Sequence, residues 1–165
     1  MKNLVLIGMP GVGKSTVGVI LAKVLGYEFV DSDLVIQKKE GRLLKDIIEE
    51  QGPEGFIEVE NRINSELDVT SSIIATGGSI VYGKEAMEHL RQIGTIIYLR
   101  QSLEEIEARL TNIKNRGVVF KDGQTMKDLY NERCTLYERY ADITIDEEGL
   151  DIEQTIEAVV KALEK

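Results

Sequence analysis

The sequence predicts an α/β fold in which a parallel sheet carries helices on both faces. Short apolar runs of strand length alternate with segments of helical period from one end of the chain to the other. A glycine-rich loop, GMPGVGKS, joins the first apolar run to the first helical segment. No internal repeat, low-complexity segment or linker interrupts this alternation. We therefore expect one domain over residues 1–165.

The first half of the chain contains three of the expected strands. NLVLIG and SIIAT are short apolar runs typical of buried strands. Glycine is common just after the last turn of a helix, and proline is common in the first turn. Glycines and prolines in the sequence therefore mark the expected helix boundaries. The expected elements are a strand at 3–8, a helix at 14–25 ending at Gly26, a strand at 28–31, helices over 34–51 with a break at Gly41, a helix opened by Pro53, and a strand at 72–76.

The second half continues the alternation. Ser102 and Glu105 have the spacing of a capping box, which predicts that a helix starts there. Residues 113–124 contain turn formers and mixed charge without a period. The remaining expected elements are a helix near 83–92, a strand at 95–99, helices at 102–112 and 125–140, a strand at ADITI (141–145), and a helix at 151–164.

Composition and charge exclude several classes of protein. The net charge of −9 argues against a nucleic-acid partner, because phosphate backbones require a basic face. No apolar run is long enough to span a bilayer, and the run before the glycine-rich loop is too short for a signal peptide. The single cysteine, Cys134, excludes an internal disulfide. We predict a monomer in the cytoplasm that binds small molecules, with no membrane partner.

The glycine-rich loop predicts a site for ATP. GMPGVGKS at 8–15 matches G-x-x-x-x-G-K-[ST], in which glycines let backbone N–H groups approach phosphate oxygens. Lys14 would act on the outer phosphates and Ser15 would ligate Mg²⁺. The alternative is a glycine-rich turn without a ligand. The predicted nucleotide-binding residues of the loop are Gly11, Val12, Gly13, Lys14, Ser15 and Thr16.

Two carboxylates follow the second strand, in DSD. Asp31 and Asp33 would face the crevice at the carboxyl ends of the parallel strands, where ligands bind in such sheets. One could hold the water shell of Mg²⁺ and the other could accept a hydrogen bond from an acceptor hydroxyl. The alternative is that they cap a helix.

The sequence resembles the shikimate kinase family. GMPGVGKST, DSD, FIEVE, TGGS, RGVV and ERCTLY follow one another in the family's order and at similar spacing, over nearly the whole chain. The resemblance implies the three-layer P-loop NTPase fold, with a five-stranded sheet of order 2-3-1-4-5. It also implies a substrate-binding helical region at about 32–68 and a short lid at about 112–125.

The resemblance also implies a role for each matching residue. Asp31 would assist Mg²⁺, Asp33 would be the general base and bind substrate hydroxyls, and Glu60 would support the acceptor pocket. Gly78 would lie against the substrate, and Arg133 would bind the substrate carboxylate. Arg109 would lie beside the adenine, and Arg116 would close over the phosphates from the lid. The implied activity is transfer of the γ-phosphoryl group of ATP to a hydroxyl of shikimate.

Three departures from the family pattern affect the acceptor site and the lid. Ile57 stands where the family has an arginine that binds the carboxylate, and Ser79 stands for the third glycine of G-G-G. The lid has Gly117, Val118 and Val119 in place of a proline and two leucines. Arg62 shares Ile57's helix but not its face, and whether it compensates is open. The alternatives are a sister kinase for a sugar acid or polyol, a nucleoside monophosphate kinase, and a non-catalytic ATP-binding regulator.

Overall fold

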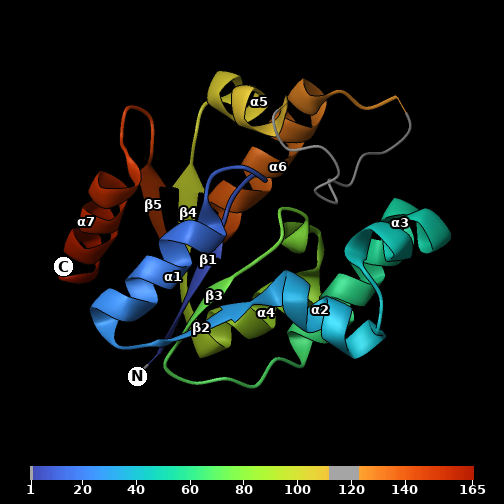
Figure 1. Cartoon of the computed structure of the whole chain (residues 1–165), viewed down its shortest axis with the longest axis horizontal. Coiled ribbons are helices and arrows are strands. Elements are labelled where there is room, and N and C mark those ends of the chain that lie inside the picture. Colours follow the sequence, from blue (N-terminus) through green and yellow to red (C-terminus); the bar gives the residue numbers. More distant parts are fainter. Residues whose placement is uncertain (1, 112–122) are drawn as a thin grey trace.

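A computed structural model describes residues 2–111 and 123–165. Its strands form one parallel sheet in the order β2-β3-β1-β4-β5, which confirms the expected order (Figure 1). The strands are β1 (Asn3–Ile7), β2 (Glu28–Asp31), β3 (Ser72–Ala75), β4 (Gly94–Arg100) and β5 (Ile143–Asp146). All five residues of β1 are buried, because this strand pairs with β3 on one side and β4 on the other. Its uninterrupted apolar run is what a strand covered on both faces requires.

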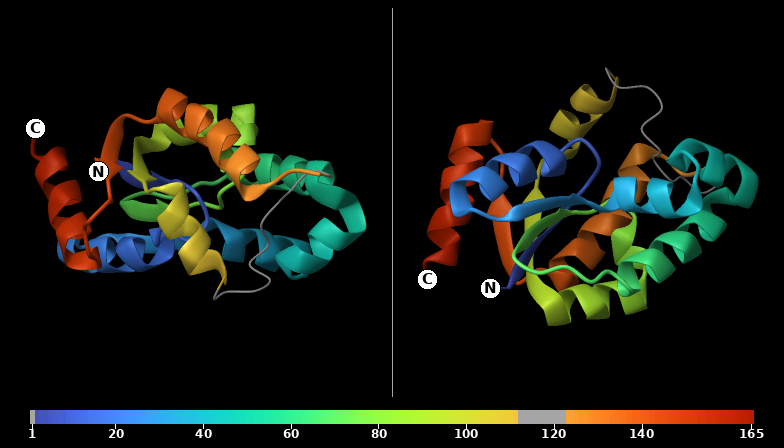
Figure 2. Two further views of the ribbon diagram at one scale, coloured as in Figure 1. Left: turned by 90° about the horizontal axis from the view of Figure 1, so that it is seen from above. Right: turned by 60° about the horizontal axis from the view of Figure 1, so that its bottom comes forward.

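Helices cover both faces of the sheet. In the left view of Figure 2, α1 and α6 lie on opposite sides of the strands. The helices are α1 (Lys14–Leu25), α2 (Ser32–Glu40), α3 (Leu44–Ser65), α4 (Lys84–Ile93), α5 (Leu103–Thr111), α6 (Met126–Tyr140) and α7 (Ile152–Leu163), with a 3₁₀ turn η1 (Ile80–Tyr82). The arrangement follows from parallel pairing, since each return to the sheet needs a crossover, and crossovers place helices on the faces.

The helices between β2 and β3 form a unit beside the sheet. Gly41 ends α2 with a φ of 66°, and Gly52 interrupts α3 with a φ of 75° immediately before Pro53. Both breaks confirm the boundaries expected from the sequence. These helices enclose a small apolar cluster of their own, made of Ile36, Ile47, Phe56, Val59 and Ile63. The cluster holds α3 in place without contributing to the main core under the sheet.

Two local predictions were wrong in detail. The last strand begins at Ile143, two residues later than expected, because Ala141 still caps α6 through a hydrogen bond from its N–H to Tyr137 O. Ser102 does cap α5, since its Oγ accepts from Glu105 N at 3.2 Å. The reciprocal half of the capping box is absent here, because Ser102 N donates instead to the side chain of Gln101 at 2.9 Å.

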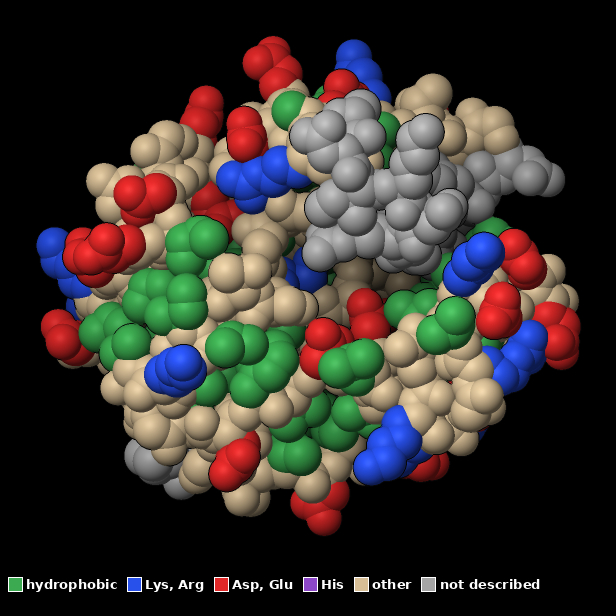
Figure 3. Space-filling model, in the orientation of Figure 1, with side chains coloured by type: hydrophobic (Ala, Val, Ile, Leu, Met, Phe, Trp, Pro, Cys, Tyr) green, Lys and Arg blue, Asp and Glu red, His purple; other side chains and the backbone are tan. Residues whose placement is uncertain are grey.

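The surface carries charges of both signs. Figure 3 shows acidic and basic side chains scattered over the face it displays, around the rim as well as near the centre. Within the described part of the chain, no helix has both the length and the apolar character that a bilayer crossing needs.

Candidate active site

The phosphate loop takes the conformation that its glycines allow. Gly8, Gly11 and Gly13 have φ values of 151°, 89° and 89°, a region that residues with a Cβ rarely enter. At Gly8 a Cβ would lie 2.6 Å from Leu99 O, so the start of the loop must also be small. Lys14, which is 8% exposed, donates from Nζ to Gly8 O at 2.7 Å and to Met9 O at 2.9 Å.

Asp31 caps α2, which is the alternative that the sequence left open, and it also contacts the phosphate loop. Its Oδ1 caps α2 by accepting from Asp33 N at 3.0 Å and from Leu34 N at 3.4 Å. Its Oδ2 accepts from Ser15 Oγ at 3.4 Å, which joins the end of β2 to the phosphate loop. Two hard oxygen donors therefore stand together where the phosphates of a nucleotide would lie. Oxygen ligands of this kind, completed by phosphates and water, suit Mg²⁺.

Asp33 lines the same cleft and lies against the turn that follows β3. A Cβ on Gly77 would stand 2.8 Å from Asp33 Oδ1 and 2.9 Å from Glu60 Oε2. The two carboxyl groups therefore reach the same glycine from α2 and from α3. Only a residue without a side chain leaves both of them room.

Arg133 reaches the next residue of the same turn. A Cβ on Gly78 would lie 2.8 Å from Arg133 Nη1 and 2.8 Å from Pro10 Cδ, between α6 and the phosphate loop. Arg133 is 1% exposed, and its guanidinium lies 5.5 Å from the centre of the Tyr82 ring, close enough for a cation–π contact. Tyr137, one turn further along α6, donates to Gly78 O at 2.6 Å and fixes the turn.

These residues line one cleft at the carboxyl ends of the strands. Its walls come from the phosphate loop, from Asp31 and Asp33, from α3 and from the turn after β3; the lining includes Lys14, Ser15, Thr16, Asp31, Asp33, Glu60, Gly77, Gly78, Ser79 and Arg133. The cleft brings together a phosphate-binding loop, a carboxylate and a buried guanidinium. That set can hold a polyphosphate and a small anionic alcohol side by side.

Arg109 lies across the phosphate loop from this cleft. Its Nη1 donates to Gly11 O at 2.9 Å, and its Nε donates to Glu105 at 3.0 Å. It lines a second hollow together with Val12, Gly13 and Thr16. Arg116 and residues 112–122 of the expected lid lie outside the described residues.

Comparison with known proteins identifies the family. A model of the shikimate kinase family matches residues 10–164. The chain belongs to the shikimate kinase family. A shikimate kinase of Thermodesulfovibrio yellowstonii is 38% identical, with 100% of this chain and 96% of that protein covered. One from Persephonella marina is 36% identical, with 97% and 98% covered.

Solved structures of the family have the same fold. The shikimate kinase of Acinetobacter baumannii in complex with shikimate superposes with a TM-score of 0.90 at 32% identity, covering 99% of this chain and 93% of that one. The enzyme of Aquifex aeolicus gives 0.81 at 30% identity, with 98% and 96% covered. The chain is therefore an ATP-dependent kinase that phosphorylates a hydroxyl group of a small molecule.

Two of the three departures from the shikimate kinase pattern, Ile57 and Ser79, lie among the described residues. Ile57 packs against the apolar cluster of α2 and α3 and is not among the described residues that line the cleft. Arg62 is 55% exposed and pairs with Glu40 on α2 at 3.5 Å, so it does not replace the missing arginine. Ser79 Oγ donates to Glu60 Oε1 at 2.6 Å. Its hydroxyl hydrogen is therefore directed to a neighbouring side chain rather than to a ligand.

Several residues that shape the cleft were missed from the sequence. Tyr82 and Tyr137 hold Arg133 and the glycine turn, and Leu44 and Phe56 supply an apolar part of the cleft wall. A signal for Tyr137 existed, because it lies four residues after Arg133 on a helix and so shares its face. No comparable signal marks Leu44, which reaches the cleft only through the packing of α3.

Glu60 is a carboxyl group held in its neutral form. It is 1% exposed, and its pKa is raised from 4.5 to about 8, chiefly by this burial and also by the charge of Asp33. The hydrogen bond from Ser79 and the charges of Arg133 and Lys14 act in the opposite direction. Its Oε2 has no hydrogen-bond partner among the described residues. At neutral pH the group is therefore mostly protonated.

This pKa predicts how stability depends on pH. A folded-state pKa above the unfolded one means that the folded protein binds the proton more tightly. The stabilising contribution of Glu60 is therefore fully present below about pH 4.5 and is lost as pH rises through about 8. Glu60 should make the free energy of unfolding fall by up to about 1.4 kcal/mol per pH unit in that window. Glu60→Gln should remove this part of the slope, leaving a smaller one from Glu147, whose pKa is also raised. Urea unfolding at pH 5, 6.5 and 8 measures it.

The control is Glu58→Gln, on the same helix but exposed to solvent. It should keep the slope of the unchanged protein. Equal slopes for all three proteins would contradict a buried neutral Glu60.

Proposed function

We propose that this chain transfers the γ-phosphoryl group of ATP to a hydroxyl of shikimate. One observation carries the proposal. Asp33 Oδ1 and Arg133 Nη1 reach consecutive glycines of one turn, each 2.8 Å from the position of a Cβ, opposite the phosphate loop. A carboxylate suits a hydroxyl and a guanidinium suits a carboxylate. Shikimate offers both groups, and the similarity to the complex from Acinetobacter baumannii supports this acceptor.

The phosphate loop would bind the nucleotide. Backbone N–H groups of Gly11, Val12 and Gly13 would hold the phosphates, with Thr16 following in the first turn of α1 and Arg109 beside the adenine. Lys14 would contact the outer phosphates. Ser15 and Asp31 would hold Mg²⁺, which supplies positive charge against the phosphate oxygens when it is bound.

Asp33 would act at the reacting oxygen. The acceptor hydroxyl bonds to the γ-phosphorus while the bond from that phosphorus to the bridging oxygen breaks and releases ADP. Asp33 orients the hydroxyl and takes its proton as the new bond forms. Arg116, from the lid, would close over the phosphates and offset the charge that builds on the transferred group.

Arg133 and Gly78 would form the acceptor end of the cleft. Arg133 would bind the carboxylate without the second arginine of the family pattern, while Gly78 would let the ring lie against the backbone. Glu60 stays neutral beside Asp33 and so adds no negative charge that would repel an anionic acceptor. We further propose that residues 1–165 form one kinase domain, monomeric and cytoplasmic, with residues 32–68 as its acceptor-binding region and 112–125 as its lid.

A coupled assay of ADP release with Mg-ATP and shikimate tests the proposal. The unchanged protein should turn over shikimate. Ile57→Arg should lower the KM for shikimate by about tenfold to a hundredfold, the worth of one charge-assisted hydrogen bond, with little change in kcat. Gln51→Arg is the control, because it adds the same charge at an exposed, neutral position of α3.

The outcome separates the two candidate acceptors. Turnover by the unchanged protein shows that Arg133 suffices for the carboxylate. Activity that appears only in Ile57→Arg would mean a related kinase with a different hydroxylated acceptor. No turnover of shikimate by either protein would overturn the proposed substrate.

A further inference from the structure

The residue that follows the two glycines after β3 joins their turn to the acceptor side of the cleft. Ser79 Oγ donates to Glu60 Oε1 at 2.6 Å, and the two residues are only 4% and 1% exposed. Gly77 and Gly78 carry no side chain, so this contact to α3 depends on the residue that follows them. None of the steps proposed above uses the Ser79 hydroxyl. A buried hydroxyl bonded to a buried carboxyl group fixes how that carboxyl group is turned.

The other carboxyl oxygen of Glu60 faces Asp33. Glu60 Oε2 lies 2.9 Å, and Asp33 Oδ1 lies 2.8 Å, from the position of one Cβ on Gly77, so the two oxygens are neighbours across that position. Oε2 is buried and has no hydrogen-bond partner among the described residues. A buried polar atom without a partner costs free energy, so a neighbour that completes its hydrogen bond stabilises the site. Asp33 Oδ1 is an acceptor of this kind.

The surroundings of Glu60 supply the hydrogen for such a bond. Two carboxyl groups that lie this close resist being ionised together. Burial and the charge of Asp33 on α2 raise the pKa of Glu60 to about 8, against the opposite effects of Ser79, of Arg133 on α6 and of Lys14 in the phosphate loop. Glu60 is therefore an acid with one hydrogen at neutral pH. Because its Oε1 accepts from Ser79, that hydrogen belongs on Oε2.

We propose that Ser79 is a positioning residue: by fixing Oε1 of Glu60, it directs the Oε2 hydrogen of Glu60 toward Asp33, the proposed base. The hydrogen bond forms when Asp33 Oδ1 turns to Glu60, and it leaves the second oxygen of Asp33 to take the proton of the acceptor hydroxyl. A hydrogen bond to a carboxylate favours its ionised form, which is the form that accepts a proton. Glu60 keeps its own proton throughout the reaction. The inference rests on the proposed role of Asp33.

The first test follows the ¹³C NMR signal of the Asp33 carboxyl group from pH 6 to pH 10, without nucleotide or acceptor. Asp33→Asn identifies the signal, since it is missing there. In the unchanged protein the signal should move with a midpoint near pH 8, as Glu60 loses the hydrogen that it directs at Asp33. Glu60→Gln should abolish this step. Ser79→Ala should make the step smaller, because the hydrogen is no longer held toward Asp33.

Ser72→Ala is the matched control, because it removes a buried serine hydroxyl at the opposite end of β3, where Ser72 Oγ donates to Thr70 O at 2.9 Å. It should lower stability and keep the full step. Ser79→Thr retains a hydroxyl and should also show the full step. An unchanged protein without the step, or a Ser79→Ala protein whose step is as large as that of Ser72→Ala, would overturn the inference.

The second test measures kcat with Mg-ATP and shikimate. Ser79→Ala should lower kcat by about tenfold, the effect of losing one hydrogen bond that orients the base, and Ser72→Ala should not. In the unchanged protein kcat should fall by about tenfold between pH 7 and pH 9, since the protonated fraction of Glu60 falls by that factor around a pKa of about 8. Glu60→Gln keeps a donor at every pH, so its kcat should not fall. An equal fall in Glu60→Gln would overturn the inference.

The two tests separate this inference from the proposed substrate. The NMR step needs no acceptor, so a normal step together with no turnover of shikimate would overturn the substrate and support the placement of Ser79 and Glu60. Normal turnover without the step would overturn the inference alone.

Discussion

Replacing Asp33 with Asn is expected to lower kcat with shikimate by about 10²- to 10⁴-fold while the affinity for ATP stays nearly unchanged. The amide has almost the same shape as the carboxylate but cannot take the proton of the acceptor hydroxyl. Asp33 lies at the glycine turn and not at the phosphate loop, since its Oδ1 is 2.8 Å from the position of a Cβ on Gly77. Steady-state kinetics with varied ATP and varied shikimate, together with a direct measurement of ATP binding, separate the two effects.

The control for this variant is Asp46→Asn, an exposed aspartate in the first turn of α3. It should leave every constant unchanged within experimental error. If Asp33→Asn instead raised only the KM for shikimate and kept kcat, Asp33 would bind the acceptor without acting as its base. Loss of ATP binding would place Asp33 in the nucleotide site and contradict the proposed division of the cleft.

The parts of the site that lie close together in the sequence were the parts that could be predicted. The phosphate loop needs glycines at fixed offsets, and Gly8, Gly11 and Gly13 do take the positive φ that the pattern implies. Asp31 and Asp33 follow a strand end, and parallel strands bring such ends to one edge of the sheet. Local chemistry and strand order are therefore enough to place Lys14, Ser15 and the two aspartates at one edge.

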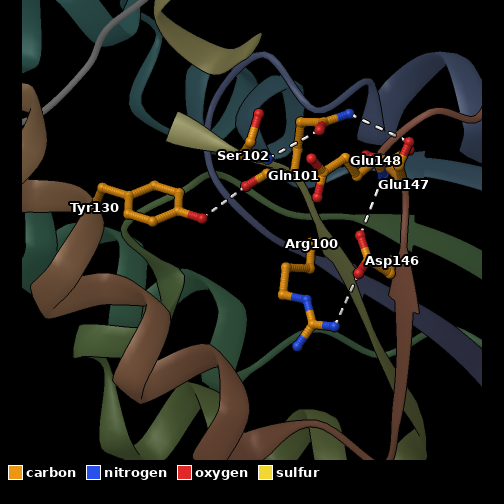
Figure 4. A network of polar contacts seen from close by, with 7 residues as sticks. All are labelled: Arg100, Gln101, Ser102, Tyr130, Asp146, Glu147 and Glu148. Carbon is orange, nitrogen blue, oxygen red and sulfur yellow. Dashed lines mark hydrogen bonds and ion pairs between the residues drawn. The ribbon is translucent and has the colours of Figure 1, made fainter. Parts of the chain in front are cut away.

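The contacts between distant segments could not be predicted in the same way. Ser79 and Glu60 meet only because α3 packs against the turn after β3, and their hydrogen bond of 2.6 Å has no signature in either local sequence. Glu147 is similar, because its surroundings come from distant segments: its N–H donates to Arg100 O at 2.8 Å across the ends of β4 and β5 (Figure 4), and it lines a hollow with Val12 of the phosphate loop. Charge alone marks it as one acidic residue among many. Its energetic role follows from its environment, which the sequence does not specify position by position.

The substitution Lys14→Met is expected to lower kcat/KM for ATP by about 10²- to 10³-fold, the usual effect of removing one group that stabilises transition-state charge. Methionine keeps much of the side chain's length but removes the ammonium group. The loop also loses the donor that now bonds Gly8 O at 2.7 Å and Met9 O at 2.9 Å, so nucleotide binding should weaken as well. This combined loss distinguishes Lys14 from Asp33, whose replacement should spare ATP binding.

Lys23→Met is the matched control for that experiment, because it removes an exposed lysine from the last turn of the same helix, α1. Kinetics should not change in it, whereas both kcat and ATP binding should fall in Lys14→Met. If Lys14→Met kept ATP binding and lost only kcat, the ammonium would act on the transferred phosphoryl group alone. If it kept both, the loop would bind phosphate through its backbone N–H groups without help from Lys14, and the proposed role of this residue would be wrong.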